Sequence, residues 1–495
     1  MLLPLVACSA GAAKWDITPS ISAEERYTDN VGLAPDASKR GEWITKITPG
    51  ISVAANGAQL RFNAIYDPDV VYYARGQYDN QVYQRGNAVG TVELAKKLLF
   101  LDFGAKADQY NASLQAPQAA NNANATGNLA TVSSYYASPY LRQDFGSNVH
   151  GEARFTGSVV NSDDRTQLAN SVADRVDLRL NSGAAYKLFT WNVDYFREND
   201  VYEDEQNNIL SQVIKANAKR LITSTVGLIA RVGYDRYRVG PETLEGTAWN
   251  AGFDWTPSPR TRFAVTAGRR FYGDDYSLDL SHRTRRTTWS AVYSQNITTT
   301  RAEFFAPDPT RTAGYLNTLF SSQYSDPVAR EKAVQDFIAR TSLPPGLIAQ
   351  TNFFTSKLIL VKRWQASVGV LGARNVVLAY LYRETREALT VGAQSTATAG
   401  DFALGDTVTQ TGVSSQWNWR MTAQNSWNMS AGYNRNEFSG ANRVDNVKYV
   451  GMGLSRQIEP KLVGALNYRR QQSDSNALVG NYTENAVFAT IKKRF

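Results

Sequence analysis

The sequence contains very few of the residues on which most enzyme sites depend. It has one cysteine, Cys8, and two histidines, His150 and His282, among its 495 residues. A single cysteine excludes a disulfide framework, and two isolated histidines exclude a histidine-rich metal site. Neither histidine lies in a hydrolase motif, and no phosphate-binding loop or dinucleotide fingerprint occurs. The sequence therefore predicts a protein that is not an enzyme and that holds neither a cofactor nor a metal.

The sequence also lacks any long hydrophobic run. Its mean hydropathy is −0.38, and no stretch approaches the roughly 20 consecutive apolar residues that a membrane helix needs. Aromatic residues are nevertheless abundant, at 11%. Two fold classes remain: a soluble all-β protein, or a membrane β-barrel, in which apolar and polar residues alternate so that no window is hydrophobic on average.

No Gly/Ser-rich or Pro-rich linker divides the chain, although a soluble chain this long usually forms several domains of about 100–200 residues. A barrel can grow as one domain, because each added strand widens the closed sheet. The 53 basic and 45 acidic residues, with a net charge of +8, are spread along the whole sequence. This distribution indicates solvated turns and a mixed-charge interior, with no stripe that would bind nucleic acid.

Alternation of apolar and polar residues is the main secondary-structure signal. It is clearest where Phe189, Trp191, Val193 and Tyr195 share one face of a predicted strand, while hydroxyl, amide and carboxylate residues between them share the other. We expect the aromatic face to contact lipid. The same alternation recurs in residues 176–181, 247–255 and 427–434.

Strand length and loop length together favour the membrane barrel over a soluble sandwich. The predicted strands are about 10–14 residues long, which suits a tilted membrane strand better than a globular sheet. Tight turns alternate with long polar connections, as in barrels with short periplasmic turns and long extracellular loops. We therefore predict an all-β, antiparallel, up-and-down transmembrane barrel of about 22 strands (range 18–24). It comprises residues 14–495, has both termini on the periplasmic side, and lies in the bacterial outer membrane. The long connections are residues 28–40, 111–131, 161–172, 301–351, 391–405 and 473–480.

The two ends of the chain carry export and assembly signals. Residues 1–13 resemble the remnant of a signal peptide, with Ala10-Gly11-Ala12 fitting the small-x-small cleavage pattern. The sequence before Cys8 also resembles a lipoprotein cleavage box, so lipidation of Cys8 is the alternative to ordinary cleavage. At the other end, Phe495 closes a final strand and resembles the signal that the barrel-assembly machinery reads.

One long extracellular loop, residues 301–352, contains a predicted helix in Ser325–Thr341. Asp326 can cap this helix, and Val334, Phe337 and Ile338 share one side of it. The helix either lies on the surface or folds into the pore as a gate. A barrel of about 22 strands is wide enough that natural examples are plugged, so we hypothesise that this helix folds inward and sets the effective pore size.

The polar faces of the predicted strands would line the lumen. Their charges are mixed, so they suit simple solvation as well as selectivity and name no substrate. Calcium at the acidic cluster Asp67-Pro68-Asp69 is conceivable, but solvated turns are far commoner. The predicted lumen-lining residues are Arg61, Asp102, Lys106, Asp177, Arg179, Asp194, Arg231, Asp235, Asp254, Arg262 and Arg270.

Five segments, taken in order, carry a family resemblance: residues 14–20, 28–31, 280–289, 325–341 and 417–420. Together they resemble a family of uncharacterised outer-membrane barrels found with exosortase/PEP-CTERM sorting systems. The resemblance covers essentially the whole chain and implies a Gram-negative exopolysaccharide gene neighbourhood, but it implies no site residue.

The leading functional hypothesis is a pore or conduit that serves exopolysaccharide or surface-protein export. The alternatives are a general or solute-selective porin, a barrel sheath around a periplasmic partner, and a gated receptor. Gated receptors carry an N-terminal plug of about 150 residues, whereas strand-like sequence here follows the signal directly. The expected partners are outer-membrane lipid, the barrel-assembly machinery, and polysaccharide or periplasmic export proteins.

Overall fold

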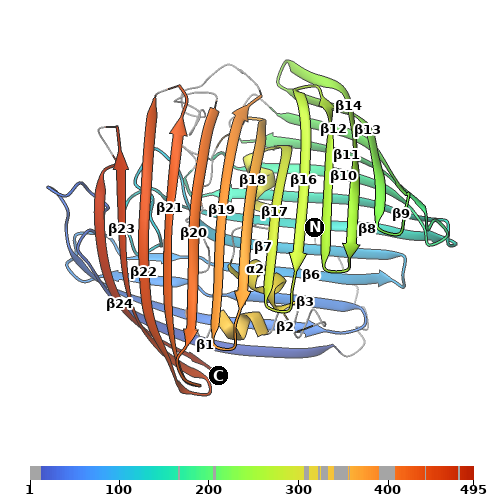
Figure 1. Ribbon diagram of the computed structural model, residues 1–495. Coiled ribbons are helices and arrows are strands. Elements are labelled where there is room, and N and C mark those ends of the chain that lie inside the picture. Colours follow the sequence, from blue (N-terminus) through green and yellow to red (C-terminus); the bar gives the residue numbers. More distant parts are fainter. Residues whose placement is uncertain are drawn as a thin grey trace, which may run out of the picture.

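A computed structural model places all the strands of the protein in one closed sheet (Figure 1). It describes residues 13–164, 168–203, 208–305, 312–321, 324, 330, 333–338, 355, 357–389, 407–440, 442–477 and 480–495. The residues outside these ranges include Asp326, the predicted cap of the loop helix. No helix among the described residues has the length and apolar character needed to cross a membrane.

The strands follow one another around the wall, with two short helices, α1 (Thr300–Phe305) and α2 (Thr312–Phe320), between β17 and β18. The strands are β1 (Lys14–Thr28), β2 (Glu42–Asn56), β3 (Leu60–Tyr66), β4 (Asp69–Tyr73), β5 (Gln81–Tyr83), β6 (Gly86–Ala95), β7 (Leu99–Asn111), β8 (Leu129–Phe145), β9 (Val149–Ser162), β10 (Ser171–Ser182), β11 (Phe189–Tyr202), β12 (Ile209–Leu221), β13 (Val226–Val239), β14 (Glu242–Ser258), β15 (Thr261–Arg270), β16 (Gly273–Arg283), β17 (Thr287–Thr298), β18 (Ile359–Leu371), β19 (Asn375–Ala388), β20 (Thr407–Arg420), β21 (Asn425–Phe438), β22 (Arg443–Glu459), β23 (Leu462–Ser475) and β24 (Tyr482–Arg494).

The barrel closes because β1 pairs antiparallel with both β2 and β24. Two wall strands are interrupted. Strands β3 and β4 both pair with β2 and form one wall strand, and β6 and β5, their partners, form the next. The break between β3 and β4 falls at Pro68, which has no N–H to donate to a sheet. The 24 segments therefore make 22 wall strands, which confirms the predicted fold and strand count.

The two rims of the barrel differ. Lys14 lies opposite Asn56, and the backbone N–H of Phe495 donates to the carbonyl oxygen of Pro19 at 2.9 Å, so the described ends of the chain meet at the rim of the short turns. We call this the periplasmic rim and the opposite one the extracellular rim. Seven of the ten tryptophans lie within three residues of a strand end at the periplasmic rim, as expected for an aromatic girdle at a membrane interface. They are Trp15, Trp191, Trp255, Trp289, Trp417, Trp419 and Trp427.

Alternation along each strand sorts the side chains between two environments. In β13, Leu228, Val232 and Tyr234 are exposed on the outer face, whereas Asp235 and Tyr237 point inward and are buried. The aromatic face predicted for β11 is also the outer one, with Phe189 46% exposed. An outer wall of exposed aliphatic and aromatic residues can be stable only against lipid, because water would meet a continuous apolar surface.

We expect Val232→Arg to destabilise the barrel by about 2–4 kcal/mol, because this side chain is near the middle of β13 and would carry a charge into lipid. Val232 is 60% exposed and lies between Ala216 and Trp249. Asn192→Arg is the control, because Asn192 lies on the inner face, where a charge meets water. Urea unfolding in lipid vesicles measures the difference, and equal destabilisation by both variants would show that the two faces are misassigned.

The segment between β17 and β18 contains more helix than the one short helix expected. Besides α1 and α2, residues 333–338 are helical, within the predicted Ser325–Thr341 helix. Helix α2 lies among the strands in Figure 1, and its contacts place it inside the barrel.

Candidate pore and the segments that cross it

The chain between β17 and β18 has described residues near both rims of the barrel. It starts and ends at the extracellular rim, where Thr298 pairs with Ile359. Leu319 of α2 nevertheless packs in one buried cluster with Leu371 and Val376, the strand residues on either side of the short periplasmic turn at residues 372–374. The described residues of this segment therefore pack inside the barrel, and we call them the plug.

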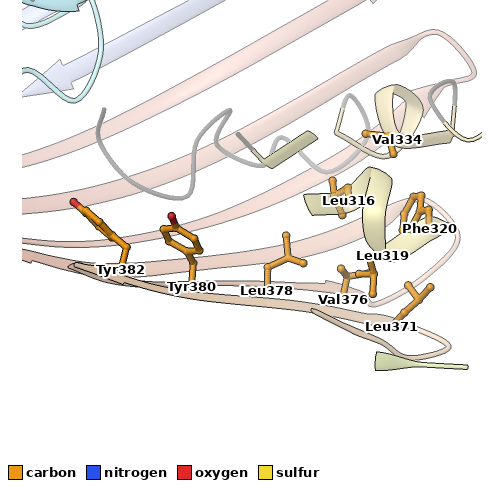
Figure 2. Close-up of a cluster of buried hydrophobic side chains, with 9 residues drawn as sticks. All are labelled: Leu316, Leu319, Phe320, Val334, Leu371, Val376, Leu378, Tyr380 and Tyr382. Atoms are coloured by element: carbon orange, nitrogen blue, oxygen red, sulfur yellow. The ribbon is translucent and has the colours of Figure 1, made fainter. Parts of the chain in front are cut away.

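A buried apolar cluster joins helix residues of the plug to the inner face of β19. Figure 2 shows the labelled side chains of β19 projecting to the side of the strand on which α2 and Val334 lie. Val334 is fully buried, and Phe337 and Ile338, the other two residues of the predicted gate, are partly buried against the same cluster. The complete buried cluster is Leu316, Leu319, Phe320, Val334, Leu371, Val376, Leu378, Tyr380 and Tyr382.

Polar contacts fix the plug at the periplasmic rim. Arg283, the last residue of β16, donates to the hydroxyl of Ser321 at 3.1 Å. Arg494, the last residue of β24, pairs with Asp336 at 3.2 Å. The two arginines belong to different parts of the wall, so the plug is held from both sides where it reaches the periplasm.

Helix α1 fixes the plug near the extracellular rim. Arg301 is 1% exposed and donates to the carbonyl and hydroxyl oxygens of Ser158 on β9, both at 2.8 Å. The same guanidinium lies 3.9 Å from Glu198 and 3.8 Å from Asp200, both on β11. A buried arginine between two carboxylates satisfies charges that would be costly to bury alone.

The acidic residue of α1, Glu303, contacts a different part of the barrel wall. Glu303 pairs with Arg386 of β19 at 2.9 Å, and Arg386 also pairs with Glu384 at 2.6 Å. Since β11 and β19 are separated along the wall by β12–β18, helix α1 bridges two sides of the lumen. Arg301 and Arg386 are buried and Glu303 is partly buried, so the two sets of ion pairs hold the helix in one position.

A second segment, residues 112–128 between β7 and β8, also crosses the lumen. The amide of Asn122 donates to Asp69 of β4 at 2.7 Å, and that of Asn124 donates to Glu484 of β24 at 2.7 Å. Leu114 packs with Ile359 and with residues of β20 and β21. This segment closes part of the extracellular half of the barrel.

The sequence predicts an ordinary extracellular loop at residues 111–131. It does not predict that this segment lies inside the lumen. The available signal was composition, because residues 111–130 contain no charged residue and many amides. Amide side chains can satisfy buried backbone groups without burying a charge. Asn128, for example, accepts from the N–H of Ser113 at 2.9 Å and donates to the carbonyl oxygen of the same residue at 2.9 Å.

All eleven predicted lumen-lining residues lie on the inner face, but eight of them form separate ion pairs and the set makes no single constellation. Asp235 and Arg270 pair at 2.8 Å, and Asp254 is shared by Lys219 and Arg262 at 3.0 and 3.2 Å.

Four further predicted residues form ion pairs at other places on the inner wall. Arg179 pairs with Asp194 at 2.9 Å, and Asp177 pairs with Arg175 at 2.7 Å. Asp102 pairs with Arg154 at 2.7 Å.

Three of the predicted residues have other surroundings. Lys106 donates to the hydroxyl of Tyr110 at 2.6 Å. Arg61 lies in register with Thr91, which donates to Asp102 at 2.8 Å. Arg231 is exposed on the inner face of β13. At the acidic cluster, both Asp67 and Asp69 pair with Arg85.

A polar cavity of about 720 Å³ lies along the inner wall from β10 to β17. Its lining includes Lys215, Lys219, Arg231, Asp254 and Arg270, together with several asparagines. The contacts described above lie mainly on β4, β9, β18–β21 and β24. Within the wall from β10 to β17 they are made to β11 and β16, so the cavity lies along the part of the wall where few described plug contacts occur.

No protein-family model matches the sequence, and no curated protein matches it. Among solved structures, the fold is similar to the ferric-catecholate import receptor Fiu of E. coli K12, with 9% identity, coverage of 96% of this chain and 81% of that chain, and a TM-score of 0.49. The siderophore receptor PirA of Acinetobacter baumannii gives 8% identity, 98% and 81% coverage, and a TM-score of 0.48. The outer membrane protein OpdK of Pseudomonas aeruginosa gives 9% identity, 97% and 99% coverage, and a TM-score of 0.36.

The architecture defines the class of protein. A closed antiparallel sheet of 22 wall strands leaves no free edge, so every strand can satisfy its backbone groups in lipid. Its outer face is apolar and its inner face is polar and charged, which is the arrangement of Gram-negative outer-membrane barrels. The protein is an outer-membrane β-barrel.

Proposed function

We propose that the protein is a transport pore of the outer membrane whose lumen is narrowed by the plug, the described residues between β17 and β18, and by residues 112–128. The observation that carries this proposal is the path of the first segment, which leaves and rejoins the wall at the extracellular rim while Leu319 packs at the periplasmic rim. A barrel of 22 strands without a plug would leak small solutes freely. A plug built from loops of the barrel meets the same physical need as a separate plug domain.

The cavity along β10–β17 is the proposed passage. Its walls carry charged and amide side chains, which can hydrogen-bond water and hydrophilic solutes. Its volume of about 720 Å³ lies in the range of small-molecule sites. A solute would move between this wall and the plug.

The finer setting is an exopolysaccharide or exosortase (PEP-CTERM) export system, which we propose on the sequence resemblance alone. A general porin and a barrel sheath around a periplasmic partner are the alternatives. The buried ion pairs that hold the plug favour a narrow pore over a wide general porin.

Single-channel recording in planar bilayers tests the pore. We expect purified, heat-modifiable protein to give small, stable conductance steps, far below those of an open barrel of the same strand number. Complete absence of conductance in correctly folded protein would contradict the open-passage proposal and favour a barrel that opens only with a partner.

A further inference from the structure

The inner wall of the proposed passage carries a row of amide side chains with one arginine in it. The pairings Asn181–Asn192, Asn192–Asn217, Asn217–Arg231 and Arg231–Asn250 place these five residues side by side on five neighbouring strands. Neighbouring strands are about 4.8 Å apart, so the row is about 20 Å long. All five residues line the cavity.

The charge at this row is positive. Five cationic residues and two carboxylates line the cavity. The cationic residues are Lys215, Lys219, Arg231, Arg262 and Arg270, and the carboxylates are Asp254 and Asp275.

Most of these charged side chains form ion pairs within the protein, and Arg231 differs from them. Arg270 pairs with Asp235, and Lys219 and Arg262 share Asp254. In the described part of the chain, no carboxylate pairs with Arg231, whose guanidinium is exposed to the cavity. An exposed guanidinium without a protein carboxylate can bind the carboxylate of a solute with two parallel hydrogen bonds.

Two carboxylates close to the row, Asp275 and Asp194, are engaged elsewhere. Asp275 accepts from Asn250 at 2.9 Å and from the hydroxyl of Tyr272 at 2.7 Å. Asp194, the cross-strand neighbour of Lys215, is paired with Arg179 at 2.9 Å. Lys215 also lines the cavity, two residues before Asn217 and on the same face, so a second cation lies close to the row.

The amides define the rest of the ligand. Each asparagine side chain offers two donors and an acceptor without net charge, which is the complement of hydroxyl groups. We propose that the row around Arg231 is a binding subsite for polyhydroxylated carboxylates, the chemical class of sugar acids. Arg231 and Lys215 bind the carboxylate, and Asn181 and Asn217 bind hydroxyl groups. Asn192 donates one N–H to Asp194 and binds a hydroxyl group with its other N–H and its amide oxygen. This inference rests on the proposed passage and names the solute class that it prefers.

Isothermal titration calorimetry on the full-length protein in detergent tests the subsite directly. D-glucuronate is the probe and D-glucose is the uncharged comparison. We expect binding of glucuronate and none of glucose at the same concentration. Arg231→Gln should weaken glucuronate binding about tenfold or more, as loss of a charge-assisted hydrogen bond predicts. Arg435→Gln is the matched control, because Arg435 pairs with Glu437 on an exposed part of β21, and it should leave binding unchanged.

The outcomes separate this inference from the proposed function. No binding of glucuronate, equal binding of glucose, or an unaffected Arg231→Gln variant would overturn the subsite. Stronger binding of inorganic phosphate than of glucuronate would overturn the hydroxylated-carboxylate class. Binding that follows the expected pattern in a protein without any conductance would support the subsite and contradict the open passage instead.

Discussion

Deleting residues 300–357 and joining Thr299 to Leu358 through a short Gly/Asn turn is expected to raise single-channel conductance several-fold. The flanking residues Thr298 and Ile359 are already paired, so the shortened hairpin closes without distorting the wall. The variant removes α1, α2 and the helical residues 333–338 from the lumen. Current through a pore grows with its free cross-section, and these elements occupy the lumen at both rims.

Two smaller deletions show how much each part of the plugging segments contributes to the change in conductance. Removing residues 326–340 takes away Val334, Phe337 and Ile338 but leaves α1, so its conductance should lie between those of the wild type and the full deletion. Removing residues 113–127 alone should also widen the extracellular half. Heat-modifiable gel mobility and a β-dominated circular dichroism spectrum establish that each variant is folded. Unchanged conductance in a folded 300–357 deletion would reject the plug as the constriction.

Replacing Arg301 with alanine is expected to release the upper part of the plug. The guanidinium is 1% exposed, and its loss would leave Asp200 and Glu198 close together without their shared cation. Removing one partner of a buried ion pair costs about 3–5 kcal/mol. We therefore expect frequent conductance fluctuations and cleavage of the segment by protease in intact vesicles, whereas the wild type resists.

The control for this variant is Arg435→Ala, which breaks an exposed ion pair with Glu437 and should cost about 0–1 kcal/mol. It should change neither conductance noise nor protease resistance. Equal behaviour of the two variants would mean that Arg301 does not hold the plug in place.

The sequence by itself determined the wall of the barrel. Alternation has a period of two residues, so it is readable in any short window, and it assigned Phe189 and Trp191 to the outer face and Asp235 and Asp254 to the inner face. The strand count of 22 followed from the same pattern and from the sorting of short and long connections. The interruption at Pro68 is also local, because it follows from the missing N–H of that residue.

Only the tertiary structure decided what fills the barrel. Asn124 and Glu484, which hydrogen-bond inside the lumen, are 360 residues apart in the sequence, and Arg301 donates to Ser158, 143 residues before it. The helical spacing of Val334, Phe337 and Ile338 shows an apolar side, but it suits a surface helix as well as a plug. The choice depends on the apolar inner wall of β19, where Leu378, Tyr380 and Tyr382 accept the helices. The local sequence pattern shows which face of a segment is apolar. Which residues bury that face depends on how the closed barrel brings distant strands together.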